Sequence, residues 1–503
     1  MLWVISLLSF VCVARCARIL GVFPTPSISH QVVYQPVWQE LSLRGHQVTV
    51  FTPNPLKNPK LTNLTEIDMS STYDIINRDD ISKTMSKNNY LIKTVLWVAN
   101  FFTEVIEENL KQSESLIKDP RRKFDLIIVE TLHPLVYSYA CRFKAPVIGI
   151  SSLGVFLQTH DAVGNPTHPA LNPDLLLNFV GEIGLYQRAY SAFYNIWYRL
   201  LYHWHILPQG DKVARKYFGD SCPHLGDIER NVSLILVNTN PILHPVRPNV
   251  PAIIEMGQMH INSKKPLPQA SVSFYLHLRL NHLQNYLDRS TQGVIYFSLG
   301  SNVKSANLTE NVRKVIIQAL SELPYNVLWK WETDHLPDQP KNVMTQKWLP
   351  QQDLLGHKNI KAFVTQGGLQ SMEEAITNGV PLIGMPFFAD QPLNVMKMVN
   401  LGIARSVDHA TMTKASLKEV IIEVAENEKY RTKVRELRDL LFDQPMNGLD
   451  KAVWWIEYVL RHKGARHLRS PAVDMPWYEY FLLDVAASVL LILGIVTYLV
   501  FLS

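Results

Sequence analysis

The sequence predicts an α/β fold with two doubly wound parallel sheets, each in a domain of its own. Its 503 residues are too many for one compact domain. In both halves of the chain, short apolar runs that are typical of buried parallel strands alternate with helical patterns. Between the halves, residues 241–269 are rich in proline and poor in periodicity, which is typical of a linker.

The first domain spans residues 17–240, and its first expected strand is the apolar run 18–24. The helix that follows should end at Arg44 and Gly45, because glycine is a common C-terminal stop. No G-x-G-x-x-G motif is present, which argues against a dinucleotide site. Further strands are expected at 46–52, 124–129 and 147–151.

Residues 183–206 form a helical pattern that is aromatic nearly all round. Two interpretations are open. The helix packs in the core, or it lines a lipophilic acceptor pocket or a surface that dips into a membrane.

The linker extends over residues 241–290, and the second domain over 291–447. The small-residue turn 299–302 follows the first strand of this domain and suits a phosphate group. After the domain, the segment 448–476 contains a helix at 449–461 that we expect to pack back across the first domain. The strands of the second domain are expected at 293–298, 326–331, 360–365 and 380–385.

The N-terminus has the pattern of a secretory signal peptide, residues 1–16. An apolar run ends in Ala14-Arg15-Cys16, which places small residues at the −3 and −1 positions. Three N-x-S/T sequons agree with entry into the secretory pathway, at Asn63, Asn231 and Asn307. Cys141 and Cys222 would remain after cleavage, either paired in an oxidising lumen or free and buried.

Residues 480–502 predict a transmembrane helix preceded by interfacial aromatic residues. Basic residues before the span would place that side in the cytosol, whereas a cleaved signal places it in the lumen. We expect the signal to prevail, because a long translocated domain overrides loop charge. The expected topology is therefore single-pass type I.

The amino-acid composition adds little about the class of protein. Hydrophobic content of 47% with 18% charged residues is ordinary globular composition. The net charge of +5 is spread along the chain and gives no argument for nucleic-acid binding. The sequence contains no Asp-x-Asp motif of the kind that binds a metal, so we expect neither a metal nor a cofactor.

Residues 348–391 contain every group needed to hold a nucleoside diphosphate. Trp348 can stack on a base, an interaction worth roughly 1–3 kcal/mol. The strand 360–365 ends at Gly367-Gly368, and the free N–H groups of the next helix favour phosphate. Glu374, one turn into that helix, can accept hydrogen bonds from a ribose diol.

Asp390 and Gln391 follow the strand 380–385 at its carboxyl end, where open α/β sheets bind ligands. In the first domain, His30 and Glu130 also follow strands at the carboxyl edge. An imidazole backed by a carboxylate can take a proton from an acceptor hydroxyl. The sequence does not give the distance between them.

The order and spacing of these residues resemble the UDP-glycosyltransferase family, which includes the UDP-glucuronosyltransferases, and especially its membrane-bound insect and insect-virus members. The similarity covers nearly the whole chain, including 444–469 and the start of the span, YFLLDV. It implies the GT-B fold, in which two Rossmann-like domains face each other across a cleft. It also implies that the first domain binds the acceptor and that the second binds the UDP-sugar.

The resemblance implies a role for each site residue. His30 would be the general base, and Glu130, where the family usually has aspartate, would orient it. The UDP-sugar groups are assigned as follows: uracil to Trp348, the nucleoside to Gln351, the diphosphate to Ser301, Gly368, Gln370 and Ser371, ribose to Glu374, and the sugar hydroxyls to Asp390 and Gln391.

The chain departs from the family at Gln366, where most relatives have a histidine that contacts the diphosphate. Glutamine can still donate a hydrogen bond but carries no charge, so leaving-group stabilisation would rest on the helix N-terminus and neutral donors. The basic cytosolic tail that helps retrieval to the endoplasmic reticulum is also missing, because hardly a residue follows the span.

The resulting hypothesis is a glycoprotein enzyme of detoxification in the endoplasmic reticulum membrane, with lumenal catalytic domains. It would transfer a sugar, glucose by resemblance, from a UDP-sugar to a hydroxyl of a small lipophilic acceptor, with inversion. Two alternatives stay open: a non-catalytic binder of small hydrophobic molecules, suggested by Gln366 and Glu130, and a GT-B nucleotide-sugar epimerase. The protein could also form a homo-oligomer.

Overall fold

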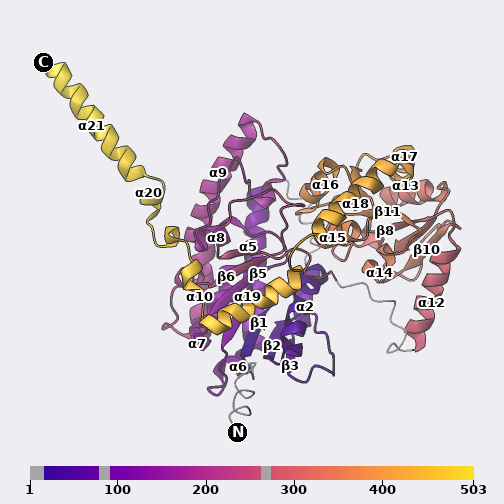
Figure 1. The fold of residues 1–503 in the computed structure, drawn as a ribbon, viewed down its shortest axis with the longest axis horizontal. Coiled ribbons are helices and arrows are strands. Elements are labelled where there is room, and N and C mark those ends of the chain that lie inside the picture. The colour runs from indigo at the N-terminus through magenta and orange to yellow at the C-terminus, as the bar shows by residue number, and fades with distance from the viewer. Residues whose placement is uncertain (1–15, 79–90, 262–273) are drawn as a thin grey trace, which may run out of the picture.

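The fold consists of two parallel sheets in separate α/β domains, followed by an extended C-terminal helix (Figure 1). The computed structural model describes residues 16–78, 91–261 and 274–503. The expected signal peptide therefore lies outside the described residues, except for Cys16.

The first sheet has seven parallel strands in the order β3-β2-β1-β4-β5-β6-β7. The strands expected from the sequence are present within a few residues. Three others were not predicted, namely β3, β6 and β7. The strands are β1 (Arg18–Val22), β2 (Gln47–Thr52), β3 (Leu64–Asp68), β4 (Leu126–Glu130), β5 (Val147–Ser151), β6 (Leu234–Val237) and β7 (Ile253–Glu255).

The second sheet has six parallel strands in the order β10-β9-β8-β11-β12-β13. The sequence missed the edge strands β10 and β13, which have four and three residues and hold few buried side chains. The strands are β8 (Val294–Ser298), β9 (Asn326–Lys330), β10 (Val343–Gln346), β11 (Ile360–Thr365), β12 (Leu382–Gly384) and β13 (Ala404–Ser406).

Helices cover both faces of each sheet, so alternate residues of a strand enter different apolar cores. On β1, Leu20 and Val22 belong to one core, and Ile19 belongs to the other. In the first domain the helices are α2 (Ile28–Leu43), α3 (Tyr73–Arg78), α5 (Leu91–Gln112), α6 (Glu114–Lys118), α7 (Tyr139–Phe143), α8 (Leu157–Ala162), α9 (Leu185–Leu201), α10 (Leu207–Phe218) and α11 (Leu225–Arg230).

In the linker and second domain the helices are α12 (Phe274–Arg289), α13 (Glu310–Ser321), α14 (Gln351–Leu355), α15 (Leu369–Thr377), α16 (Gln391–Asn400), α17 (Lys414–Glu426) and α18 (Glu428–Phe442). They are followed by α19 (Gly448–His462), which returns to the first domain (Figure 1). There Val453 and Ile456 are buried in the same core as Val37 of α2. Helix α19 therefore packs the chain that follows the second domain against the first domain.

The aromatic helix is longer than the sequence predicted. It continues from α9 through a π-helical turn, Tyr202–Ile206, into α10. Pro208 at the start of α10 has no N–H for the usual i→i−4 hydrogen bond, which explains the wider turn. One face of α9 packs in the core through Tyr194 and Tyr198, while Phe193 is exposed. The core interpretation therefore holds for one face, and a role of the exposed face in an acceptor pocket or at a membrane stays a prediction.

The chain ends in α20 (Trp477–Tyr480) and α21 (Leu483–Leu502). Helix α21 is long and apolar enough to cross a membrane, with a mean hydropathy of 2.7, and its most apolar window is 0% buried. Figure 1 shows it projecting away from both domains. Cys141 and Cys222, whose state the sequence left open, are joined by a disulfide within the first domain.

Candidate active site

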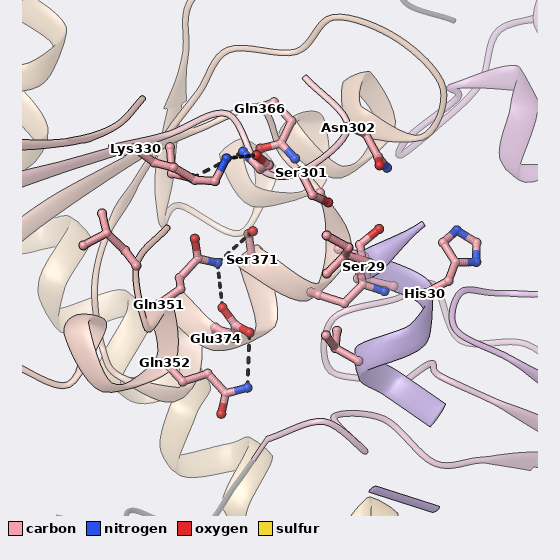
Figure 2. A pocket seen from close by; sticks show the side chains of 18 of the residues that line it. Ser29, His30, Ser301, Asn302, Lys330, Gln351, Gln352, Gln366, Ser371 and Glu374 are labelled. Carbon is pink, nitrogen blue, oxygen red and sulfur yellow. Dashed lines mark hydrogen bonds between the residues drawn. The ribbon is translucent and has the colours of Figure 1, made fainter. Parts of the chain in front are cut away.

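A pocket of about 340 Å³ lies between the two domains at the carboxyl ends of both sheets. The N-terminus of α2 and Leu153 line it on one side, and the loops after β8, β11 and β12 line it on the other. Figure 2 shows Ser29 and His30 at the start of α2, across the pocket from the polar side chains of the second domain. The pocket brings together residues that are hundreds of positions apart in the sequence.

His30 and Glu130 are in contact. Nδ1 of His30 lies 2.9 Å from Oε1 of Glu130, whose side chain is 0% exposed. A carboxylate at Nδ1 favours the tautomer with the proton on that nitrogen. Nε2 is then a free base, and it makes no hydrogen bond to the described residues. The His30 ring lines the pocket and is 17% exposed at its side chain.

Other groups hold the Glu130 carboxylate in place. Its Oε1 accepts a hydrogen bond of 3.1 Å from the hydroxyl of Tyr34, and its Oε2 accepts one of 3.2 Å from the backbone N–H of Thr25. The side chain of Gln31 donates to the carbonyls of Phe23 and Thr25 and so supports the loop before α2. Glu130, whose side chain is longer than that of aspartate, thus reaches His30 from the end of β4 at hydrogen-bond distance.

Ser152 connects His30 to the second domain. Its Oγ lies 2.9 Å from Nδ1 of His30, and its carbonyl accepts hydrogen bonds from Gln370 and Asn238, both 3.2 Å long. Asn238 also donates to Oε2 of Glu373 at 3.1 Å. The loop after β5 therefore bridges the expected base and helix α15.

Trp348 presents its ring to the pocket and is 60% exposed. Nζ of Lys330 lies 5.8 Å from the centre of this ring. The same ammonium donates to the carbonyl of Gly300 at 3.0 Å and to Glu332 at 2.9 Å. An open indole face beside a fixed cation is well suited to a planar base and a nearby anion.

Two glutamine side chains hold the Glu374 carboxylate (Figure 2). Gln351 donates to Oε2 at 2.6 Å, and Gln352 donates to Oε1 at 3.2 Å. Gln351 also donates to Ser371 at 3.0 Å and accepts from Tyr296 at 2.9 Å. Burial raises the pKa of Glu374 to about 7. Near neutral pH this carboxyl group is therefore poised between its neutral and ionised forms.

The N-terminus of α15 opens into the pocket. Gly368 is the N-cap and supplies no side-chain hydrogen bond, so the first N–H groups of the helix are available to an anion. Ser301 and Ser371 line the pocket beside it. Gly300 has φ +76°, and a Cβ there would lie 2.2 Å from Nε2 of Gln366, so the close approach requires glycine.

Gln366 is buried at the base of this region, and its Oε1 accepts a hydrogen bond of 3.1 Å from Thr365. Its amide N–H₂ is directed toward Gly300 and Ser301 (Figure 2). The side chain can therefore donate to a bound ligand but brings no charge.

Asp390 and Gln391 also line the pocket, at the start of α16. Burial raises the pKa of Asp390, and Asn394 donates to its Oδ2 at 2.7 Å. Oε1 of Gln391 accepts from the backbone N–H groups of Phe387 and Phe388. The amide N–H₂ of Gln391 is thereby left for a ligand.

All ten residues expected at the donor site line this pocket together with His30, while Glu130 lies directly behind the histidine. Sequence reasoning missed several supporting residues, namely Tyr34, Ser152, Tyr296, Lys330 and Gln352. Gln352 could have been found, because it adjoins Gln351 at a helix start. Tyr34 lies inside helix α2 and the others in strands or in the loop after β5, where their residue types carry no signal of their own.

The three sequons differ in their surroundings. Asn231 and Asn307 are exposed. Asn63 is partly buried, and its Nδ2 donates to the carbonyl of Ser42 at 2.8 Å and to that of His46 at 3.0 Å. Both amide hydrogens of Asn63 are therefore in use.

Comparisons with known proteins agree with this geometry. The family model for UDP-glucoronosyl and UDP-glucosyl transferases matches residues 18–503. The chain is 35% identical to UDP-glycosyltransferase UGT5 of Dactylopius coccus, with 97% of this chain and 92% of that protein covered. It is 32% identical to the ecdysteroid UDP-glucosyltransferase of Spodoptera littoralis nuclear polyhedrosis virus, with 95% of both chains covered.

A mammalian relative, UDP-glucuronosyltransferase 2B15 of Rattus norvegicus, is 30% identical, with 95% of this chain and 90% of that protein covered. Among solved structures, the glycosyltransferase of kitacinnamycin has a TM-score of 0.59 at 21% identity and covers 88% of this chain and 99% of its own. TcCGT1 in complex with UDP has a TM-score of 0.59 at 14% identity, with 89% and 100% covered.

The fold is therefore GT-B, and the class of protein is a glycosyltransferase that takes its sugar from a UDP-sugar donor and passes it to an acceptor. Within that class, the chain belongs to the UDP-glucuronosyl and UDP-glucosyl transferase family, as the sequence motifs predicted.

Proposed function

We propose that the protein transfers glucose from UDP-glucose to a hydroxyl group of a small lipophilic acceptor, with inversion of the anomeric centre. The observation that carries this proposal is the contact between His30 and Glu130 beside the pocket. Nε2 of His30 removes the acceptor's hydroxyl proton, and the buried Glu130 carboxylate stabilises the imidazolium that forms. The acceptor oxygen then forms its bond to the anomeric carbon as the bond to UDP breaks.

UDP leaves with the electron pair of that bond, and protein groups stabilise its charge. In this proposal the N–H groups of α15 and the hydroxyls of Ser301 and Ser371, which lie at the pocket, donate to the diphosphate. Gln366 donates without charge. Lys330 also lines this pocket, but its ammonium is already paired with Glu332.

Glucose as the donor sugar is favoured by the names of the insect and viral relatives, which include a UDP-glucosyltransferase of Dactylopius coccus at 34% identity. Asp390 and the amide of Gln391 are suited to sugar hydroxyls. A lipophilic acceptor is supported by the exposed aromatic face of α9, and the viral relatives are named for transfer to ecdysteroids.

We further propose that α21 anchors the protein in the endoplasmic reticulum membrane with both catalytic domains in the lumen. The support is the length and apolar character of α21, the signal-like N-terminus, and the disulfide in the first domain, which suits an oxidising compartment. The disulfide also agrees with the expected type I topology.

The test is a conjugation assay on microsomes that contain the protein, with several UDP-sugars and a panel of phenols and steroids. We expect glucoside product from UDP-glucose, and a decrease of about 10²–10⁴-fold in the His30→Ala variant. His335→Ala, at an exposed position outside the pocket, is the matched control and should keep full activity. Product from another UDP-sugar would show that glucose is not the donor sugar. Inverted product that still forms in the His30→Ala variant would show that His30 is not the general base.

The non-catalytic alternative makes the opposite prediction. A binder would show UDP affinity by calorimetry but no conjugate with any donor. An epimerase would release altered free sugar without needing an acceptor. The conjugation screen therefore separates the three functions in one experiment.

A further inference from the structure

A second cavity, of about 430 Å³, lies between the first domain and the segment that leads to α21. It shares no lining residue with the pocket that contains His30. Its walls come from α8, α9, α11 and residues 472–481. In volume it falls within the range of small-molecule sites, roughly 300–1,000 Å³.

The segment that forms the outer wall is docked closely on the first domain. Gly164 has φ +64°, and a Cβ there would lie 2.9 Å from Cβ of Ser470 and 3.0 Å from Val473. The ion pair between Arg469 and Asp474, at 2.6 Å, holds the same segment in a turn. The wall is therefore a packed part of the fold, and glycine is needed for its approach.

The outer wall is also the last part of the chain before α21. Trp477 and Phe481 line the cavity and are 68% and 55% exposed, and α21 starts at Leu483. Tryptophan and tyrosine are typical of the interface between a membrane and water. With α21 in a bilayer, the mouth of the cavity lies at the level of the membrane surface. This placement depends on the membrane anchoring proposed above.

Charged groups around the cavity are already paired. Arg199 forms two hydrogen bonds to Asp161, at 2.8 and 2.9 Å, and a third to Thr167 at 2.7 Å. Arg230 pairs with Asp227 at 2.5 Å. Burial lowers the pKa of His203, which keeps its ring neutral at pH 7. The described lining residues therefore offer no uncompensated charge to an ionic ligand.

Glu229 places a carboxyl group on the cavity wall. Its residue is 4% exposed, and Oε2 accepts a hydrogen bond of 2.5 Å from the hydroxyl of Tyr202. A carboxyl group on a cavity wall can also pair with a hydroxyl group of a bound ligand. Burial raises the pKa of Glu229 to about 8, so a neutral carboxyl group can donate as well as accept.

We propose that this cavity binds an uncharged lipophile drawn from the membrane, whose hydroxyl group pairs with Glu229 and whose apolar body lies against Trp477 and Phe481. Ile196 on α9 extends the apolar wall on the opposite side. The ligand chemistry has two possible sources: a resident hydroxylated membrane lipid such as a sterol, or a lipophilic acceptor on its way to His30.

The test uses the full-length protein in phosphatidylcholine vesicles with a photoreactive sterol that keeps its hydroxyl group. After illumination, the labelled residues are mapped by mass spectrometry. We expect labelling of α9 and residues 472–481, and at least a tenfold decrease when the sterol hydroxyl is replaced by a methyl ether. Labelling confined to the lipid-facing surface of α21, or insensitive to the hydroxyl, would overturn the proposal.

Variants locate the site. Ala192→Trp fills the cavity and should reduce labelling at least tenfold, while Phe193→Trp, on the neighbouring exposed position outside it, should not. Glu229→Leu removes the polar partner and should lose the preference for the hydroxyl, whereas Glu229→Gln keeps a donor and should retain it. UDP binding by each variant checks that it is folded. Equal labelling in Ala192→Trp and the unchanged protein would contradict the assignment.

Competition distinguishes the two sources. Displacement of the photoprobe by acceptors from the conjugation screen, at concentrations near their KM, indicates a staging site for the acceptor. Displacement by unlabelled sterol alone indicates a lipid site. Both outcomes support the cavity as a binding site. Labelling that persists in His30→Ala keeps this proposal separate from the catalytic one.

Discussion

The amide of Gln370 donates a hydrogen bond of 3.2 Å to the carbonyl of Ser152, across the boundary between the two domains. The hydroxyl of that serine lies 2.9 Å from Nδ1 of His30. One residue thus contacts both the expected base and the helix whose N-terminus opens into the pocket. The geometry suggests that the position of α15 is communicated to His30.

Ser152→Ala should lower kcat by about 5–10-fold, because a net hydrogen bond contributes about 1 kcal/mol. The KM for the UDP-sugar should change little, since Ser152 does not line the donor pocket. Gln370→Ala should show the same pattern if its amide mainly bridges the domains. A large rise in KM with unchanged kcat would instead assign Gln370 to the diphosphate. Steady-state kinetics with both substrates varied separates these outcomes.

Uridine affinity should rise with pH through about 7, the raised pKa of the Glu374 carboxyl group. Below this pH the group is protonated in the free protein, and above it the carboxylate can accept hydrogen bonds from both ribose hydroxyls. The expected gain between pH 6 and 8 is about tenfold at most. Uridine is the right probe because it has no phosphate that titrates in this range.

Calorimetric titration of uridine at several pH values measures this effect. Glu374→Gln is the control, since its affinity should not vary with pH. The neighbouring Glu373, whose pKa burial raises to about 8, is unchanged in that variant. A pH dependence that persists in Glu374→Gln would show that another group, such as Glu373 or Asp390, causes it.

Trp348→Ala should weaken UDP binding by about 1–3 kcal/mol, because the exposed indole face would no longer stack on uracil. Calorimetry with UDP measures the loss. Trp204→Ala, at a more exposed position on the first domain, should leave UDP affinity unchanged. If the two variants bind UDP alike, the indole lies outside the site.

Glycans are expected on Asn231 and Asn307 but not on Asn63. Attachment of a sugar replaces one amide hydrogen, and both hydrogens of Asn63 are bonded to backbone carbonyls. Nδ2 of Asn231 donates only to the carbonyl of Asp227 and keeps one hydrogen free. Glycopeptide mapping after expression in insect cells checks this pattern. A glycan on Asn63 would show that the asparagine is modified before β3, which begins at the next residue, is folded.

Removal of residues 483–503 should release the protein from membranes under alkaline wash. This truncation deletes α21 but keeps the wall of the second cavity. Fractionation followed by immunoblotting measures the release. Retention of the shortened protein would identify the exposed apolar face of α9, around Phe193, as a second attachment surface.

Much of the fold could be predicted because buried parallel strands are continuous apolar runs. The run 360–365 and the run 18–24 were located within two residues. Strands such as β3 and β13 were missed, because they lie at sheet edges where few residues are buried and the apolar signal fades. The continuation of α9 into α10 depended on a π-helical turn, which has no periodic signature.

The sequence by itself determined the donor half of the site. Trp348, Glu374 and Asp390 lie within one short stretch, and their spacing along strand, turn and helix places them at the same sheet edge. Local geometry was enough, since the carboxyl ends of parallel strands meet there.

Only the tertiary structure decided how the acceptor half of the site lies relative to the donor half. The 2.9 Å contact between His30 and Glu130, and the bridge through Ser152, join segments a hundred or more residues apart, whose separation in space depends on packing across the whole first domain. The cavity wall that contains Glu229 is a similar case. Cavities and burial are properties of a packed interior, and no pattern along the chain encodes them.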